Sequence, residues 1–135
     1  MNFFAADTKT FPSSFKDLLN RYQQTARKKK LIWDLKVEDF AKIINKPCDY
    51  CGVAPFERYN VYITKEDSYR QGNTKRMDKG WILYNGIDRV DNNLGYVSNN
   101  VVPCCKWCNY AKNNRSREEF IAWTELFRGR LQVIN

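Results

Sequence analysis

Two segments in the first third of the chain repeat apolar residues at intervals of three and four, the spacing of one helical face. The first segment carries Phe15, Leu18, Leu19 and Tyr22. The second carries Val37, Phe40, Ile43 and Ile44. Ser13 or Ser14 is a suitable N-cap for the first helix, and Asn45 and Pro47 mark the end of the second. The pattern therefore predicts two amphipathic helices within residues 12–46.

The middle of the chain changes to a strand pattern. Residues 81–90 are rich in β-forming side chains, residues 92–95 (Asn-Asn-Leu-Gly) are a turn signal, and Tyr96 and Val101 belong to a second strand. A further strand is expected around Val61–Thr64, followed by a long exposed loop. The sequence thus predicts two strands joined by a loop, with a less regular segment before them.

Helical spacing returns at the end of the chain. A short helix from Lys106 is expected to stop near Asn113. Ser116 begins a capping-box sequence, Ser-Arg-Glu-Glu. The apolar face of the final helix, about 116–131, is expected to pack on the rest of the protein. It carries Phe120, Trp123, Phe127 and Leu131.

The length and composition of the chain indicate the number of domains and the charge of the partner. The 135 residues fit one domain with a modest core, so we expect a single domain over 1–135, with a central part at about 48–120. The net charge of +8 indicates a polyanionic partner. No apolar run reaches the roughly 20 residues of a membrane span, and no signal-peptide pattern is present, so we expect a cytoplasmic protein without a membrane partner.

The chain contains five cysteines and no histidine, so a zinc site would have to be formed by cysteine sulfur. Two Cys-x-x-Cys pairs, Cys48/Cys51 and Cys105/Cys108, offer the four thiolates that tetrahedral zinc prefers. The 53 residues from 52 to 104 exceed the spacing of a minimal zinc ribbon. We therefore expect one structural zinc ion per chain, closing a loop with structure of its own. Redox-active or unliganded cysteines are the alternative, and Cys104 is expected to pack in the interior.

Between the cysteine pairs lies a set of polar residues that suits a second metal. The order is strand, loop, strand and helix, with Asp88 at the end of the first strand and Asn109 on the helix. An aspartate and an asparagine provide two oxygen ligands for Mg²⁺ or Mn²⁺, with positions left for water and phosphate. Such an open site suits phosphodiester hydrolysis. Taken singly, these residues are more typical of turns and helix caps.

This run resembles the HNH family of endonucleases, also called His-Me finger or ββα-metal nucleases. The likeness covers about residues 48–120 and is strongest to the four-cysteine subgroup of phage recombination endonuclease VII. It implies an α+β fold: a small zinc-stapled ββα-metal core with flanking N- and C-terminal helices. It also implies that Asp88 and Asn109 hold the catalytic Mg²⁺ or Mn²⁺, while Asn100 braces the loop and orients residue 89.

Arg89 departs from the family pattern, because it stands where the general-base histidine belongs and cannot accept a proton at neutral pH. One hypothesis keeps the enzyme active: the metal or Asp91 activates water, and Arg89 stabilises the scissile phosphate. The alternative is a catalytically inactive zinc-binding module that binds nucleic acid. A structural zinc scaffold for protein partners is a further alternative, but it leaves the basic charge unexplained.

Basic residues near the predicted site indicate DNA, in a branched or nicked form among others, as the partner. Those on or after the site helix are Lys106, Lys112, Arg115 and Arg117, which are expected to contact phosphates. A second basic cluster comprises Arg70, Lys75, Arg76 and Lys79. Four aromatic residues are expected to pack in the core: Tyr84, Tyr96, Trp107 and Tyr110. The resemblance further suggests a phage or mobile-element protein acting in the host cytoplasm, with a homodimer as one possibility.

Overall fold

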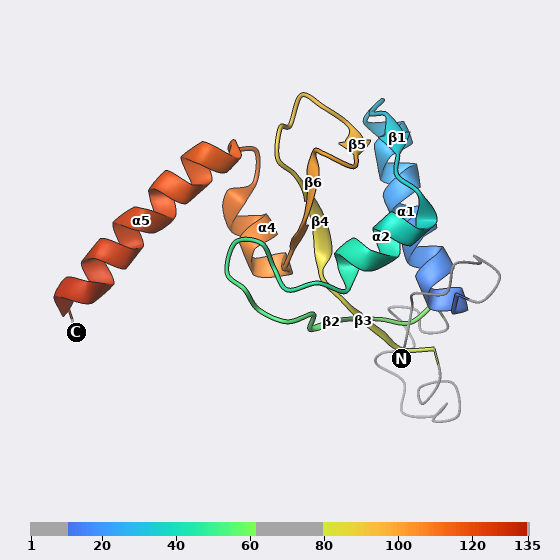
Figure 1. Ribbon diagram of the computed structural model, residues 1–135, viewed down its shortest axis with the longest axis horizontal. Helices are drawn as coiled ribbons and strands as arrows, with labels where there is room; N and C mark the ends of the chain where they lie inside the picture. The colour runs from blue at the N-terminus through green and yellow to red at the C-terminus, as the bar shows by residue number, and fades with distance from the viewer. Residues whose placement is uncertain (1–10, 62–79, 135) are drawn as a thin grey trace.

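A computed structural model describes residues 11–61 and 80–134 of the chain. The elements follow the order α1 (Ser13–Lys28), β1 (Trp33–Asp34), α2 (Val37–Ile44), β2 (Glu57–Tyr59), β3 (Ile82–Tyr84), β4 (Gly86–Arg89), β5 (Tyr96–Val97), β6 (Val101–Cys104), α4 (Lys106–Lys112) and α5 (Arg117–Ile134). Helices and small two-stranded sheets mix along the chain (Figure 1). The predicted α+β class is confirmed.

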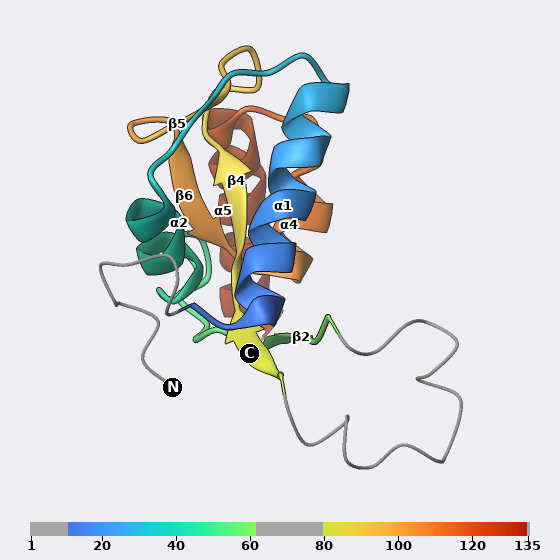
Figure 2. The same ribbon diagram turned by 90° about the vertical axis from the view of Figure 1, so that its right-hand side faces the viewer.

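An antiparallel hairpin of β4 and β6 forms the centre of the protein. Gly86 lies opposite Cys104 at one end of the hairpin, and Arg89 lies opposite Val101 at the other. The helices α1, α2 and α4 surround these two strands (Figures 1 and 2). Because α4 begins two residues after β6, the strand and the helix form one continuous ββα unit. Two smaller sheets flank it: β1 runs parallel to β5, and β2 antiparallel to β3.

The main core lies where α1 and α2 meet. Phe15 and Phe40 are fully buried, and their ring centroids are 5.6 Å apart. Tyr22 and Trp33 contact the same Phe40 ring. Both helices were expected from their apolar spacing, and both are present with nearly the expected limits. The core therefore fixes α1 beside the central hairpin.

The expected serine cap of α1 is wrong. Pro12 occupies the N-cap position, and no side chain bonds to the free amides there. Ser14 is instead fully buried, where its hydroxyl donates to the carbonyl of Gly80 and accepts from the amide of Val61 at 3.0 Å. The serine thus links α1 to the segments beside β2 and β3.

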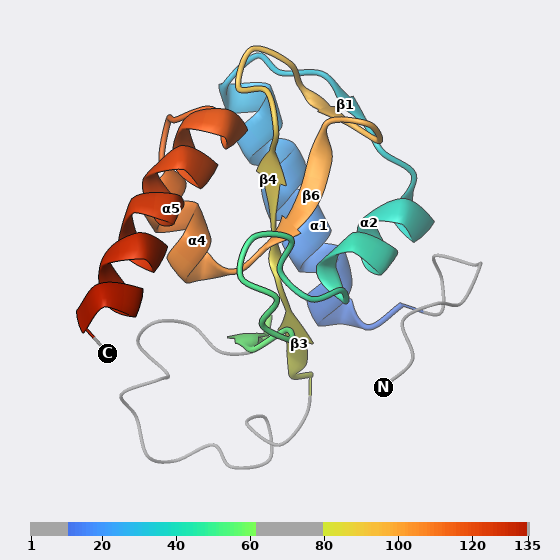
Figure 3. The same cartoon turned by 60° about the vertical axis from the view of Figure 1, so that its left-hand side comes forward.

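The final helix begins as the capping sequence predicts but does not pack as expected. The amide of Glu119 donates to the hydroxyl of Ser116 at 3.2 Å. Phe120 is buried, whereas Trp123, Phe127 and Leu131 are 38%, 51% and 55% exposed. Figures 1 and 3 show α5 leaving the body of the protein beside α4. Only the first turn of α5 therefore contributes to the core of the described part.

Some expectations fall on residues that are not described. Residues 62–64 of the expected strand and all four members of the second basic cluster (Arg70, Lys75, Arg76 and Lys79) lie outside the described ranges. Among the described helices, none has both the length and the apolar character needed to cross a membrane.

Candidate functional site

The four paired cysteines converge on one point. The sulfur atoms of Cys48, Cys51, Cys105 and Cys108 all lie within 4.8 Å of one another, and we call this group the cysteine cluster. The Cys51 and Cys105 sulfurs are 3.7 Å apart. Zinc–sulfur bonds of 2.3 Å in a tetrahedron place sulfurs about 3.8 Å apart. The geometry of the cluster therefore fits a zinc ion.

Backbone hydrogen bonds shape both halves of the cysteine cluster. In the first half the amide of Gly52 donates to the carbonyl of Cys48 at 2.9 Å, and Gly52 has a φ of +78°, which favours glycine. In the second half the amide of Cys108 donates to the Cys105 sulfur at 3.4 Å. The amide of Asp49 donates to the carbonyl of Pro103 at 2.8 Å, which joins the two halves.

The fifth cysteine lies outside the cluster, and the thiol of Cys48 differs from the other shifted thiols. Burial alone would raise the pKa of Cys48, but hydrogen bonds from neighbouring backbone amides lower that pKa to about 7. Cys104 is buried and outside the cluster, as expected, and burial raises the pKa of its thiol. Burial also raises the pKa of the Cys51 and Cys108 thiols, so among these three cysteines of the cluster Cys48 alone has a pKa lowered toward the thiolate form.

Asp88 sits near the end of β4 with 7% of its surface exposed. Its Oδ2 accepts a hydrogen bond of 2.6 Å from the hydroxyl of Tyr50, which belongs to the first cysteine segment. Its Oδ1 lies 3.2 Å from the amino group of Lys112 on α4. Burial and the Asp88 carboxylate raise the pKa of Tyr50. Asp88 is thus fixed from two sides by residues adjoining the cysteine cluster.

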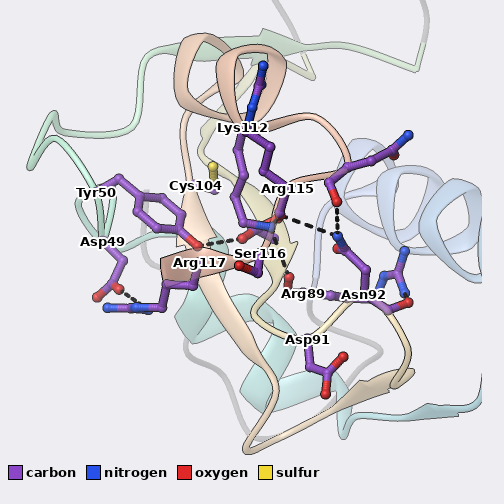
Figure 4. A network of polar contacts seen from close by, with 12 residues as sticks. Asp49, Tyr50, Arg89, Asp91, Asn92, Cys104, Lys112, Arg115, Ser116 and Arg117 are labelled. Carbon is purple, nitrogen blue, oxygen red and sulfur yellow. Dashed lines mark hydrogen bonds and ion pairs between the residues drawn. The ribbon is translucent and has the colours of Figure 1, made fainter. Parts of the chain in front are cut away.

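The prediction that Lys112 contacts a phosphate is wrong. Its side chain is fully buried, and the amino group donates to Asp88 and to the carbonyl of Arg89, the latter at 3.4 Å. Figure 4 shows the side chain extending into this polar network. A lysine so placed does not reach a phosphate on the surface. The buried position has a physical reason: a carboxylate at close range compensates the desolvated ammonium.

Arg89 directs its side chain to the loop that follows β4. One guanidinium nitrogen, Nη1, donates to the carbonyl of Asn92 at 2.7 Å and to that of Leu94 at 3.0 Å. The guanidinium also lies 5.5 Å from the ring centroid of Tyr96. Asp91, the other residue considered for water activation, accepts from the amide of Asn93 at 2.9 Å. Both residues therefore stabilise the 90–95 loop.

Asn100 binds the same loop from β6. Its Oδ1 accepts from the amide of Asp91, and its Nδ2 donates to the carbonyls of Asp91 and Gly95, all at 2.9–3.0 Å. The side chain is 3% exposed, so these bonds are shielded from water. Asn100 therefore has the position of a loop brace, and it acts on the loop that also holds Arg89.

Asp88 and Asn109 line one open cavity of about 620 Å³. Asn109 is exposed on α4, one residue after the last cysteine. Another wall of the cavity is formed by Arg21 and Thr25 of α1 and by Lys29, which caps the end of that helix. The sequence did not predict that α1 forms part of the site, because no local pattern records which helix covers the central hairpin.

The remaining predicted phosphate contacts lie on the surface with partners from the protein. Lys106 is 3.4 Å from Glu57, and Arg117 is 2.7 Å from Asp49. Arg115 donates to the carbonyl of Ala111 at 2.9 Å. These are exposed or half-exposed side chains, so such contacts hold them weakly.

The four aromatic residues divide into two groups. Tyr96 is buried and Tyr84 is half-buried, as expected. Trp107 and Tyr110 are 64% and 70% exposed on α4, so the expectation that they pack in the core is wrong. They contact each other edge to face, with ring centroids 6.4 Å apart. Because the helix is short and follows the sheet closely, one of its sides faces solvent.

Comparison with known proteins identifies the fold. The structure resembles that of the rare-cutting HNH restriction endonuclease PacI, with a TM-score of 0.52 over 95% of this chain and 88% of that one. The chain has an HNH nuclease fold. Identity between the two sequences is 21%, so the likeness concerns the HNH fold alone. The narrower likeness to the endonuclease VII subgroup remains a prediction.

The sequence comparison adds a viral relative. An uncharacterized protein of Acanthamoeba polyphaga mimivirus is 32% identical over 105 residues, which is 78% of this chain. The match spans about 15% of that protein's length. No family model matches the chain.

Proposed function

We propose that this protein is a metal-dependent endonuclease that hydrolyses phosphodiester bonds of DNA. The observation that carries the proposal is the shared cavity of Asp88 and Asn109, bounded by the ββα unit of an HNH fold. A carboxylate and an amide oxygen at one opening are suitable donors for Mg²⁺ or Mn²⁺. The net charge of +8 favours a polyanionic substrate.

Two metals have separate roles in this proposal. The cysteine cluster would hold one structural zinc ion and so fix the distance between the first cysteine segment and α4. A divalent ion held by Asp88 and Asn109 would supply Lewis-acid stabilisation of the phosphate. Each carboxylate oxygen of Asp88 has a second lone pair beside its bond to Tyr50 or Lys112, so the donor set fits such an ion.

Each side chain in or beside the cavity has a separate role in this proposal. Asn100 keeps the 90–95 loop in one shape, and Arg89 adds two further bonds to that loop. Arg21 on α1 and Lys29 at its C-cap line the cavity, where their charge would hold the substrate backbone. Arg89 cannot accept the proton of an attacking water, so position 89 supplies positive charge to the site and no general base.

A non-catalytic DNA-binding module is the second candidate. Both carboxylate oxygens of Asp88 already have partners within the protein, and the chain contains no histidine. A residue held in this way could serve the fold alone. The basic cavity would then bind phosphates without cutting.

The two candidates differ in a cleavage assay with Asp88→Asn. Purified protein is incubated with plasmid, branched and single-stranded DNA in Mg²⁺ or Mn²⁺. We expect wild type to cut and Asp88→Asn to lose at least about 100-fold of the activity while it retains its zinc and its DNA affinity. Asp34→Asn, at an exposed position of β1, is the matched control.

If wild type binds DNA but cuts none of these substrates with either metal, the binding module is the correct function. Equal cutting by wild type and Asp88→Asn, prepared side by side, would instead indicate a contaminating nuclease. The match to an uncharacterized mimivirus protein supports a virus-encoded origin, and we propose that the protein acts in the host cytoplasm. The panel of substrates tests whether branched DNA is preferred.

A further inference from the structure

Two large aromatic side chains are exposed on α4, the helix that carries Asn109. Trp107 and Tyr110 are 64% and 70% exposed, and their rings contact each other edge to face. They are three positions apart, so they lie on one side of the helix. Single exposed apolar residues are common on protein surfaces, but two large rings in contact on a helix of seven residues form a patch. We call Trp107 and Tyr110 the aromatic pair.

The fold itself does not account for the aromatic pair. Tryptophan and tyrosine are poorer helix formers than alanine, leucine or lysine, so they do not favour α4. Other side chains hold the helix in place. At its start Cys105 and Cys108 belong to the cysteine cluster, and at its end Lys112 is buried. The two rings therefore stand on a support that is fixed before any ligand binds, which lowers the entropy lost on binding.

The position of the aromatic pair connects it to the candidate site. Tyr110 directly follows Asn109, and both residues line the cavity of about 620 Å³ that also includes Asp88. Trp107 lies nearly one helical turn closer to the start of α4. A strand that leaves the cavity along α4 would therefore pass Tyr110 first and Trp107 next.

A positive charge lies beside the aromatic pair. The amino group of Lys106 is 5.1 Å from the ring centroid of Trp107 and 5.6 Å from that of Phe56. The Lys106 side chain is 38% exposed, so its charge is accessible from solvent. Lysine is depleted at protein–protein interfaces, whereas aromatic rings with basic neighbours are typical of surfaces that bind single-stranded nucleic acid. These features favour a nucleic-acid strand over a protein as the ligand of the pair.

We propose that the aromatic pair is a stacking platform for one or two unpaired nucleobases of the DNA strand that enters the candidate site. Inside a duplex both faces of a base are covered by its neighbours, so the platform takes bases that lack such a stack. The substrate class that follows is DNA with unpaired nucleotides beside the phosphate in the cavity. This inference rests on DNA as the ligand of the proposed function, but it does not require that the protein cuts DNA.

The first test compares two DNA probes by fluorescence anisotropy with the full chain. One probe is a fully paired duplex, and the other contains the same labelled strand with a shortened complement, which leaves an unpaired arm. Neither Mg²⁺ nor Mn²⁺ is added, so binding is measured without cleavage. We expect the probe with the unpaired arm to bind at least about fivefold more tightly.

Substitutions then test the two rings. Tyr110→Ala and Trp107→Ala should each lose at least about fivefold of the affinity for the unpaired arm, while duplex binding stays nearly unchanged. Tyr110→Phe keeps the ring and should bind as wild type does. Leu83→Ala, at an exposed apolar position of β3, is the matched control and should also bind as wild type does. Zinc content and far-UV circular dichroism check that each variant is folded.

Abasic sites in the unpaired arm identify the stacked base. When one abasic site is moved along the arm, wild type should lose about fivefold of its affinity at one or two positions. At those positions Tyr110→Ala or Trp107→Ala should lose nothing further, because ring and base act as one pair. Rings that served only the structure of α4 would instead give additive losses.

Three results would overturn the proposal. Equal binding of both probes by wild type would show that unpaired nucleotides are not recognised. Wild-type affinity in Tyr110→Ala and Trp107→Ala would show that the rings serve another partner, such as a protein. Abasic losses that persist unchanged in these two variants would show that the bases contact other residues.

The outcomes for the stacking platform and for the nuclease function are separable. A wild type that cuts no DNA but shows the coupling between ring and base would refute the nuclease function alone. A wild type that cuts DNA without this coupling would refute the platform alone. A wild type that binds neither probe would overturn both.

Discussion

The amino group of Lys112 lies 3.2 Å from Oδ1 of Asp88, and both side chains are buried. This ion pair connects α4 to β4, the two elements that border the candidate site. It therefore ties the stability of the ββα unit to the position of its main carboxylate. Removal of one partner would leave the other charge buried without compensation.

We predict that Lys112→Met lowers the free energy of unfolding by about 3–5 kcal/mol, because Asp88 remains charged in a buried position. Urea denaturation measures the change. Lys106→Met removes an exposed ion pair on the same helix and should cost less than about 1 kcal/mol. The double variant Lys112→Met/Asp88→Asn should recover part of the loss. Equal costs for Lys112→Met and Lys106→Met would contradict the role of the buried pair.

The Arg89 side chain offers a test of the missing general base. Histidine at this position can accept a proton near neutral pH, which arginine cannot. If the protein cuts DNA, Arg89→His should cut at least about tenfold faster than Arg89→Ala, and its pH–rate profile should acquire an inflection near pH 6.5. If the pH–rate profiles of Arg89→His and Arg89→Ala have the same shape, a residue at position 89 does not act as the general base.

Asn100 should contribute strongly to the stability of the loop. Asn100→Ala removes three buried hydrogen bonds, and we expect a loss of about 2–4 kcal/mol in the free energy of unfolding. Its exposed neighbour provides the control, since Asn99→Ala should change stability by less than about 0.5 kcal/mol. A loss below about 1 kcal/mol for Asn100→Ala would indicate that the loop is held by other contacts.

Zinc content should distinguish the four residues of the cysteine cluster from Cys104. Elemental analysis should find one zinc per chain in the wild type and in Cys104→Ala, whereas Cys51→Ser should lose the metal. A strong chelator should unfold the wild type, because metal binding and folding are coupled in such sites. Retention of zinc by Cys51→Ser would place the metal elsewhere.

The salt dependence of DNA binding tests whether the α1 side of the cavity contacts DNA phosphates. The logarithm of the binding constant should fall linearly with the logarithm of salt concentration. Lys29→Gln should reduce this slope by about one, because Lys29 lines the cavity and loses one phosphate contact. Lys42→Gln, an exposed change on α2, should leave the slope unchanged. Equal slopes for wild type and Lys29→Gln would exclude α1 from the DNA-binding surface.

The sequence predicts the elements of this fold better than their packing. Apolar spacing indicated α1, α2 and α5, and the two Cys-x-x-Cys pairs indicated the cysteine cluster. The relation of Asp88 to Asn109 followed from their order around the cysteines. These features are local, or are fixed by ligands whose chemistry allows few arrangements.

Lys112 and α5 show why the rest could not be predicted. Lysine is almost always solvated, so nothing in its sequence context marks the carboxylate that makes burial possible. Lys112 follows Asn109 by three residues, and residues at that spacing lie on the same side of a helix. This spacing was the one indication in the sequence that Lys112 faces the candidate site. The apolar face of α5, with Trp123, Phe127 and Leu131, has the same spacing as a core-facing helix, yet these side chains are exposed. The spacing alone does not show whether such a face is buried.

The cysteine cluster also sets an order of events during synthesis. Its first two ligands, Cys48 and Cys51, leave the ribosome well before the last, Cys108. At about 5–20 residues per second, the interval is about 3–11 seconds. A nascent chain has half the sulfur ligands until Cys105 emerges, and it lacks Asn109 for the whole of this interval. A chain interrupted before Asn109 therefore cannot assemble the candidate site.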